Sequence, residues 1–272
     1  MIGVFDSGIG GLTVLKELIM SLPQYHYVYL GDNARNPYGG RSDETVYEYT
    51  RQAVDFLFNK RKCEIVILAC NTASAKALRR LQQEYLPTQN SPTKRILGVL
   101  IPTAQMAMES SKSKKIGVLA TRGTVESNSF KIELKKVNGS ANVFQHSAPL
   151  LVPLIEENWI GKPETNRILK KYLKPFKAYN IDSLILGCTH YPLLEKDVKR
   201  ILGNKIKLVS SGKSASIKFM DYLTRHSEIE NLLLKDSQVE YLTTDDPNRF
   251  KEISKHIFHK KIQNVEKVNL IV

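Results

Sequence analysis

Short runs of apolar residues alternate along the chain with longer amphipathic segments. The runs have the length of buried strands and lie at 2–5, 27–30, 65–69 and 96–100. Apolar residues recur at helical spacing in the segments 12–21 and 43–60. Strands that alternate with helices of this length are typical of parallel sheets covered on both faces by helices. The pattern therefore predicts an α/β fold.

The second half of the chain repeats features of the first. Residues 2–5 read IGVF and residues 116–119 read IGVL, and each run precedes a turn and a helix. A cysteine ends a later apolar run in each half, 68 residues after Ile2 for Cys70 and 72 residues after Ile116 for Cys188. Ligands of parallel sheets gather beyond the carboxyl ends of the strands. We predict two similar parallel-sheet α/β domains that face each other across an active-site cleft.

The repeat also suggests domain boundaries. We expect residues 1–95 plus about 210–272 to form the N-terminal domain with Cys70, and residues 96–209 to form the second domain with Cys188. The last segment is assigned to the first domain because an apolar strand predicted at 239–243 needs a sheet to join.

Length and composition agree with this division. A chain of 272 residues often forms two domains, and an apolar content of 42% can supply a core for each. The apolar runs are far shorter than the roughly 18 to 20 residues of a membrane span, and the N-terminus opens directly into a strand-like run. Three cysteines without zinc-site spacing predict neither a disulfide framework nor a metal site. We expect a cytoplasmic protein with reduced thiols and no membrane partner.

The chain is basic, with 40 Lys and Arg against 27 Asp and Glu and a net charge of +13. Pairs such as Lys114/Lys115 and Lys170/Lys171 are spread over many helices and are not gathered with aromatic residues in one stripe. This distribution favours a solvated surface over a nucleic-acid partner. A basic binding protein that contacts DNA remains an alternative, and it would bind DNA in a salt-dependent manner and tolerate mutation of Cys70.

The glycine-rich turn DSGIGG at 6–11 allows two interpretations. It follows a strand as a dinucleotide-binding loop does, with Asp32 as a possible ribose partner, but Thr13 stands where the third glycine of that motif belongs. A tight turn that presents Asp6, Ser7 and backbone N–H groups to a small anion explains the same residues.

Cys70 and Cys188 each lie where a strand gives way to a helix. Unpaired N–H groups and the positive dipole end of a helix stabilise a thiolate there. A buried cysteine can also be a small hydrophobe. The neighbours of both thiols are polar, however, which favours chemistry: Asn71, Thr72, Thr189 and His190. Cys63 has no such setting.

Three ionisable residues are candidates for assisting the thiols. His190 could act as an acid or base for Cys188, or it could satisfy the start of a helix. Asp6 could assist Cys70, although carboxylates near helix starts are more often caps. Glu156 follows an apolar run, a position that is also common for a solvated helix end.

Five motifs together carry a resemblance to a known family. In chain order they are DSGIGGLTVLKEL (6–18), GDNARNPYGGRS (31–42), LACNTASA (68–75), VPLIEE (152–157) and LGCTHYPLL (186–194). The set resembles the cofactor-independent glutamate racemases of the aspartate/glutamate racemase superfamily.

The resemblance implies interconversion of L- and D-glutamate for peptidoglycan synthesis, without pyridoxal phosphate or metal, and a homodimer is expected. The family's catalytic cysteines match Cys70 and Cys188, and the Cys70 equivalent deprotonates D-glutamate. Its auxiliary acid–base residues match Asp6, Glu156 and His190. Its substrate-binding positions match Asp6, Ser7, Tyr38, Gly39, Asn71, Thr72, Thr189 and His190.

A matched pair of thiols suits this reaction. Racemisation removes the α-hydrogen from one face of a carbon and delivers a proton to the other face, which a single base cannot do. We expect Asp6 or Glu156 to assist one proton transfer and His190 the other. An aspartate racemase is the nearest alternative, because two-thiol chemistry does not depend on side-chain length.

Two segments depart from the family pattern. Ser147-Ala148-Pro149 replaces a cysteine–proline pair, and Ser210 stands where an aspartate is frequent. Both departures concern the packing around the site and not the residues assigned to its chemistry.

Overall fold

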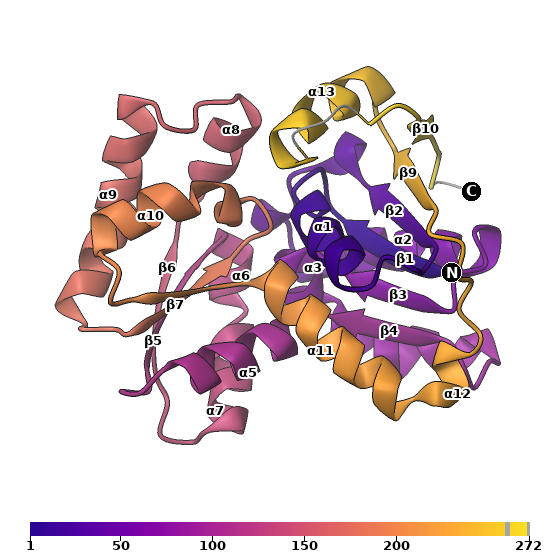
Figure 1. Ribbon diagram of the computed structural model, residues 1–272, viewed down its shortest axis with the longest axis horizontal. Coiled ribbons are helices and arrows are strands. Elements are labelled where there is room, and N and C mark those ends of the chain that lie inside the picture. Colours follow the sequence, from indigo (N-terminus) through magenta and orange to yellow (C-terminus); the bar gives the residue numbers. More distant parts are fainter. Residues whose placement is uncertain (259–261, 271–272) are drawn as a thin grey trace.

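The chain folds around two parallel β-sheets. The structure is a computed structural model that describes residues 1–258 and 262–270. Its described residues form one sheet of six strands and one of four, and every strand pairing is parallel. The larger sheet lies in the right-hand body of Figure 1 and the smaller sheet in the left-hand body. The predicted α/β class with two parallel sheets is confirmed.

The six-stranded sheet has the order β10-β9-β2-β1-β3-β4. Its strands are β1 (Ile2–Asp6), β2 (Tyr27–Gly31), β3 (Ile65–Leu68), β4 (Arg95–Gly98), β9 (Val239–Thr243) and β10 (Glu266–Lys267). In register, Ile2 of β1 pairs with Tyr27 on one side and Ile65 on the other. β9 pairs with β2, so the strand predicted at 239–243 does join the first sheet.

The four-stranded sheet has the order β6-β5-β7-β8, which repeats the order β2-β1-β3-β4. Its strands are β5 (Lys115–Ala120), β6 (Asn142–Ser147), β7 (Ser183–Gly187) and β8 (Lys207–Ser210). The two IGV runs therefore occupy equivalent strands, β1 and β5, and the two cysteines follow equivalent strands, β3 and β7. The sequence did not predict β6, because this edge strand is only half-buried and includes the polar residues Gln145 and His146.

Sheet membership bears on the division into domains. β4 pairs with β3 in the first sheet, although the boundary expected from the sequence assigns residues 96–209 to the second domain. We therefore propose that the first domain extends to about residue 98 before the chain crosses into the second.

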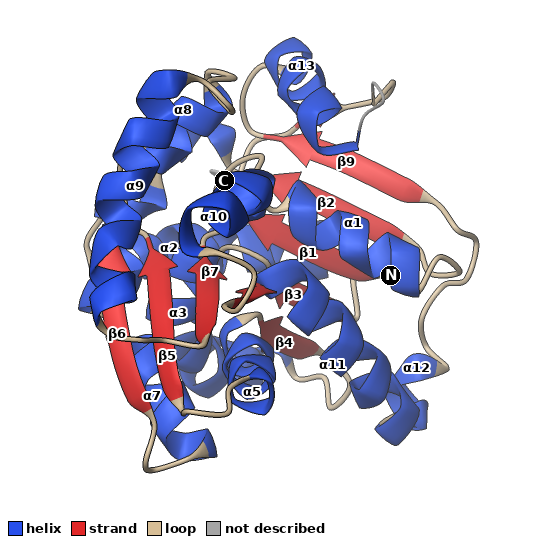
Figure 2. Ribbon diagram, turned by 60° about the vertical axis from the view of Figure 1, so that its left-hand side comes forward, coloured by secondary structure: helices blue, strands red, loops and turns tan. Residues whose placement is uncertain are grey.

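Helices cover both faces of the sheets (Figure 2). The longer ones are α1 (Leu12–Ser21), α2 (Asp43–Asp55), α5 (Leu100–Ser110), α7 (Ser129–Val137), α9 (Pro163–Ala178), α10 (Glu195–Leu202), α11 (Ser211–Arg225) and α13 (Pro247–Phe258). The shorter ones are α3 (Asn71–Lys76), α4 (Leu78–Arg80), α6 (Arg122–Glu126), α8 (Leu151–Glu156) and α12 (Ser227–Glu230). The helix predicted at 43–60 ends at Asp55 and continues as a π-helical turn, Phe56–Lys60. No helix in the described part of the chain has the length and apolar character needed to cross a membrane.

Side-chain alternation along the strands builds a core on each face of each sheet. In β3, Ile65 and Ile67 face the core beneath α1 and α11, whereas Val66 and Leu68 face the core beneath α2. The smaller sheet has the same arrangement, with Leu184 and Leu186 of β7 on the side of α9 and Ile185 on the side of α5 and α7. Each sheet is therefore buried on both faces, as parallel sheets require.

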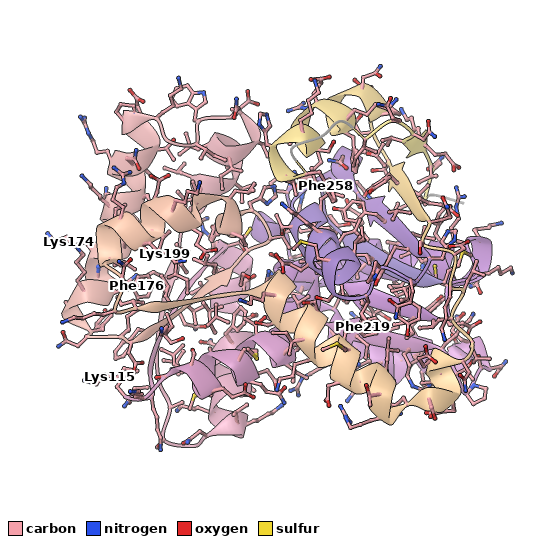
Figure 3. The ribbon with its side chains drawn as sticks, viewed as in Figure 1. Lys115, Lys174, Phe176, Lys199, Phe219 and Phe258 are labelled. Carbon is pink, nitrogen blue, oxygen red and sulfur yellow. The ribbon has the colours of Figure 1, made fainter. Side chains whose placement is uncertain are left out.

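Phe176 of α9 tests this packing. The side chain, labelled in Figure 3, is fully buried in the core between α9 and the smaller sheet. Phe176→Ala should lower the free energy of unfolding by about 3–5 kcal/mol, because it removes apolar contacts and leaves a cavity. Urea denaturation measures the change. Ile132→Ala on the exposed side of α7 is the control, expected within about 0.5 kcal/mol of wild type, and equal losses in the two variants would contradict this core assignment.

Candidate active site

The loops at the carboxyl ends of the two sheets enclose a cavity of about 410 Å³. Of the positions that the sequence assigned to catalysis or substrate binding, all but Asp6 line this cavity. Cys70 reaches it from the end of β3 and Cys188 from the end of β7, so the two halves of the chain contribute one thiol each. A cavity of this size is typical of a small-molecule site.

Cys70 is the N-cap residue of α3 and is 5% exposed. The backbone N–H of Ala73 donates to its Sγ at 3.4 Å, and the thiol in turn donates to Ser7 Oγ at 3.4 Å. Burial, followed by the nearby charge of Asp6, raises the pKa of Cys70 to about 12. The expectation that the helix start would lower this pKa is therefore wrong in its net direction, because desolvation outweighs the hydrogen bonds.

Asp6 lies beneath the cavity and is 1% exposed. It accepts hydrogen bonds from the Gly8 N–H at 3.0 Å and from Thr189 Oγ1 at 3.3 Å, so it connects the first glycine turn to the loop after Cys188. Burial raises the pKa of Asp6, and the positive charge of His190 opposes that rise. Asp6 therefore joins the two halves and affects the pKa of Cys70 without lining the cavity itself.

His190 links Cys188 to Glu156. Its Nδ1 lies 3.8 Å from Cys188 Sγ, and its Nε2 lies 3.0 Å from Glu156 Oε1. Burial alone would lower the pKa of His190, but its interactions with Cys188 and Glu156 prevail and raise the pKa to about 10. For Glu156, burial acts to raise the pKa, but the hydrogen bond and charge of His190 outweigh it and lower the pKa. Glu156 thus pairs with His190 on the side of Cys188, whereas the sequence grouped it with Asp6.

The glycine turn brings the two halves into close contact. A Cβ atom on Gly10 would lie 2.4 Å from Thr189 Oγ1 and 2.5 Å from the His190 ring. A Cβ atom on Gly11 would lie 2.4 Å from Asp6 Cβ. These glycines therefore make room for protein side chains of the site, which differs from the use of glycine in a dinucleotide-binding loop.

Asp32, the possible ribose partner, is fully buried and engaged by protein donors. Arg35 Nε donates to Oδ2 at 2.7 Å, the Tyr38 hydroxyl also donates to Oδ2, and Thr244 Oγ1 donates to Oδ1 at 2.9 Å. The structure therefore contradicts the ribose interpretation. The carboxylate instead holds the loop that presents Tyr38 and Gly39 to the cavity.

Thr121 is a lining residue that the sequence did not predict. Its Oγ1 lies 2.9 Å from Thr72 Oγ1, so this pair joins the two halves at the cavity wall. Thr121 follows β5 as Ser7 follows β1. The internal repeat, extended from the strands to the residues after them, would have identified it.

The structure also locates Cys63 and the two segments that depart from the family pattern. Cys63 is a buried free cysteine that does not line the cavity, and burial raises its pKa to about 12. In the segment that departs from the family pattern, Pro149 lines the cavity and the Ala148 carbonyl accepts a hydrogen bond from the Tyr191 hydroxyl at 2.8 Å. Ser210 is the N-cap residue of α11, but its side chain makes no capping hydrogen bond.

Comparison with known proteins identifies relatives along nearly the whole chain. The family described as Asp/Glu/Hydantoin racemase matches residues 2–216. A glutamate racemase of Geobacter metallireducens is 37% identical over 269 residues, which is 99% of this chain and 96% of that protein.

Solved structures give the same result. A glutamate racemase isoform of Bacillus anthracis superimposes with a TM-score of 0.89 at 35% identity, over 99% of this chain and 97% of that one. A glutamate racemase of Francisella tularensis in complex with D-glutamate has a TM-score of 0.87 at 32% identity, with the same coverage.

The buried pair of His190 and Glu156 predicts a pH-dependent stability. Because the pKa of His190 rises from about 6.5 in the unfolded chain to about 10 in the fold, its contribution is complete below about pH 6.5 and disappears as pH rises through 10. The contribution of Glu156, whose pKa is lowered from 4.5, is present above that value and is lost in acid. Glu156→Gln should therefore destabilise the fold most near pH 6 and progressively less toward pH 10.

Urea denaturation of the wild type and Glu156→Gln between about pH 5.5 and pH 10 measures this dependence. The control is Glu228→Gln, which alters the exposed pair of His226 and Glu228, also 3.0 Å apart. Solvent screens that pair, so its loss should be small at every pH. A Glu156→Gln effect of the same size at pH 6 and pH 10 would rule out the charged pair.

Proposed function

The chain belongs to the Asp/Glu/hydantoin racemase family and, within it, to the glutamate racemases, and we propose that Cys70 and Cys188 are the two groups that move the α-proton between L- and D-glutamate. The single observation that carries this assignment is that one thiol from each half of the chain lines the same cavity. A carbon held between them can lose a proton on one face and gain one on the other.

The two thiols have different surroundings, which gives each proton transfer its own assistants. The His190 ring lies between Cys188 and Glu156, so a protonated His190 can exchange a proton with Cys188 on that side of the site. Because the pKa of Cys70 is raised to about 12, its thiol is protonated at neutral pH and can donate a proton. This state suits conversion of L-glutamate, in which Cys188 takes the proton and Cys70 supplies one to the opposite face.

The reverse direction begins from D-glutamate and needs Cys70 as the thiolate. Ser7 accepts the hydrogen bond of the Cys70 thiol, and Asp6 lies close enough for its charge to affect the pKa of that thiol. Burial also raises the pKa of Asp6 itself, so its carboxyl group can hold a proton near Cys70. Loss of Asp6 should therefore slow the D-to-L direction first.

Hydrogen-bond donors on the cavity wall can hold the substrate and support the charge that develops during proton transfer. The wall includes the hydroxyls of Ser7, Thr72, Thr121 and Thr189 and the amide of Asn71. Donors that the fold holds in place around a cavity stabilise a developing anion far better than water does. This support, together with the two thiols, replaces an electron-sink cofactor in the proposed mechanism.

The proposed product gives the protein its role in the cell. D-glutamate is the enantiomer that peptidoglycan synthesis consumes, and we assign the chain to that supply in the cytoplasm. Assaying L-aspartate beside L-glutamate distinguishes this assignment from an aspartate racemase.

We also propose that the chain forms a homodimer through exposed apolar side chains of three neighbouring helices. Met20 of α1, Ile101 of α5 and Met220 of α11 are 68%, 46% and 47% exposed, and α11 packs against both other helices. Covering these side chains would stabilise association.

Met220→Lys should shift the sedimenting species from dimer to monomer, whereas Ile132→Lys on α7 should not. A wild-type monomer at tens of micromolar would end this proposal.

Replacement of either thiol tests the two-base scheme. Cys70→Ser and Cys188→Ser should each lower kcat in both directions by roughly 10²–10⁴-fold, because a hydroxyl cannot take the place of the thiol in proton transfer. Circular dichroism of the two enantiomers follows turnover, and incubation in heavy water follows α-deuterium incorporation.

The matched control is Cys63→Ser, which alters a buried thiol away from the cavity. It should retain wild-type turnover, and both catalytic variants should still bind D-glutamate in calorimetry. Wild-type turnover by either Cys70→Ser or Cys188→Ser would exclude two-thiol catalysis.

A further inference from the structure

A buried hydroxyl outside the cavity contacts one of the residues that line it. Ser211 is the first residue of α11 and is 2% exposed, and its Oγ donates a hydrogen bond to Asn71 Oδ1 at 2.9 Å. Ser211 does not line the cavity, whereas Asn71 does. Asn71 follows Cys70 directly, at the start of α3.

The amide of Asn71 is only half satisfied. Its Oδ1 accepts the Ser211 hydrogen bond, but its buried Nδ2 has no partner among the residues that the structure describes. Buried polar atoms nearly always have partners, and an exception at a site points to a group that a ligand completes. An amide N–H matches an oxygen acceptor, and a ligand carboxylate in the cavity would supply one.

The position of Ser211 is itself fixed by close packing of α11 on α1. A Cβ atom on the next residue, Gly212, would lie 3.0 Å from the Thr13 carbonyl oxygen and 3.2 Å from Val14 Cα. Further along α11, Phe219 is buried in a core that also contains residues of β1 and α1. Figure 3 labels this side chain in the right-hand body, which holds the six-stranded sheet in Figure 1. α11 thus packs on the body that carries Asn71, although Ser211 follows directly from β8 of the second sheet, so the Ser211–Asn71 hydrogen bond joins the two halves at the cavity.

We propose that Ser211 is a positioning residue that holds the Asn71 amide so that its N–H group can bind a substrate carboxylate. The inference rests on the proposed function. Without the hydroxyl, the amide can rotate about its side-chain bonds and turn its own oxygen toward the carboxylate, where two acceptors repel each other. Substrate binding suffers from this rotation, and proton transfer between thiols and carbon suffers less.

A double-mutant cycle between Ser211 and Asn71 tests the proposal. Ser211→Ala should lower kcat/KM for D-glutamate by about 3- to 10-fold, the range for one hydrogen bond, with most of the change in KM. Ser211→Thr, which keeps the hydroxyl, should recover most of this loss. In an Asn71→Ala background, Ser211→Ala should change kcat/KM less than 2-fold, because the amide it orients is gone.

The matched control is Ser214→Ala, one turn later in α11. Ser214 is also 2% exposed, but its Oγ donates at 2.9 Å to the Ser210 carbonyl within the same segment. This variant should have wild-type KM. A Ser211→Ala loss that is equally large in the Asn71→Ala background, or one that Ser214→Ala reproduces, would make the role structural and overturn the proposal.

The same experiment separates this proposal from the function on which it rests. If the wild type racemises glutamate but the effects of Ser211→Ala and Asn71→Ala on kcat/KM simply add, only the role of Ser211 is overturned. A wild type that binds D-glutamate but does not racemise it overturns the proposed function, and with it the positioning role.

Discussion

The parallel direction of the strands is the constraint on which the site depends. In a parallel sheet all carboxyl ends lie at one edge, so the residues that follow β1, β2 and β3 must come together. The second sheet repeats the order, and β5, β6 and β7 bring a corresponding set to the opposite side of the cavity. Two thiols 118 positions apart in the sequence therefore line one cavity.

Burial then makes the two sides of this cavity chemically different. Cys70 and Asp6 are both nearly inaccessible, and desolvation raises the pKa of each. On the other side, the interactions of His190 with Cys188 and Glu156 outweigh its burial and keep the imidazole protonated. A racemase that handles both enantiomers does not need two identical bases, only two that exchange roles.

The repeat is a scaffold on which the halves have diverged. Ser7 and Thr121 occupy equivalent places after β1 and β5, yet Ser7 contacts a thiol and Thr121 contacts a threonine. The first sheet contains β9, which has no counterpart in the described part of the second sheet. Thr244, directly after β9, donates a hydrogen bond to Asp32, and Asp32 also accepts one from Tyr38, so it holds the loop of Tyr38 and Gly39. The C-terminal segment thus supports a cavity-lining loop that lies some 200 positions earlier in the chain.

The sequence by itself determined the α/β class, the internal repeat and most lining residues, because strand periodicity and motifs are local properties. Only the tertiary structure decided that Glu156 pairs with His190, that Asp6 lies beneath the cavity and that Asp32 is occupied. It also reversed the expected direction of the Cys70 pKa, since a local pattern reports a helix start but not the extent of desolvation. Strand β6 and the partner of Ser211 escaped prediction for the same physical reason: edge position and long-range hydrogen bonds depend on how separate segments pack.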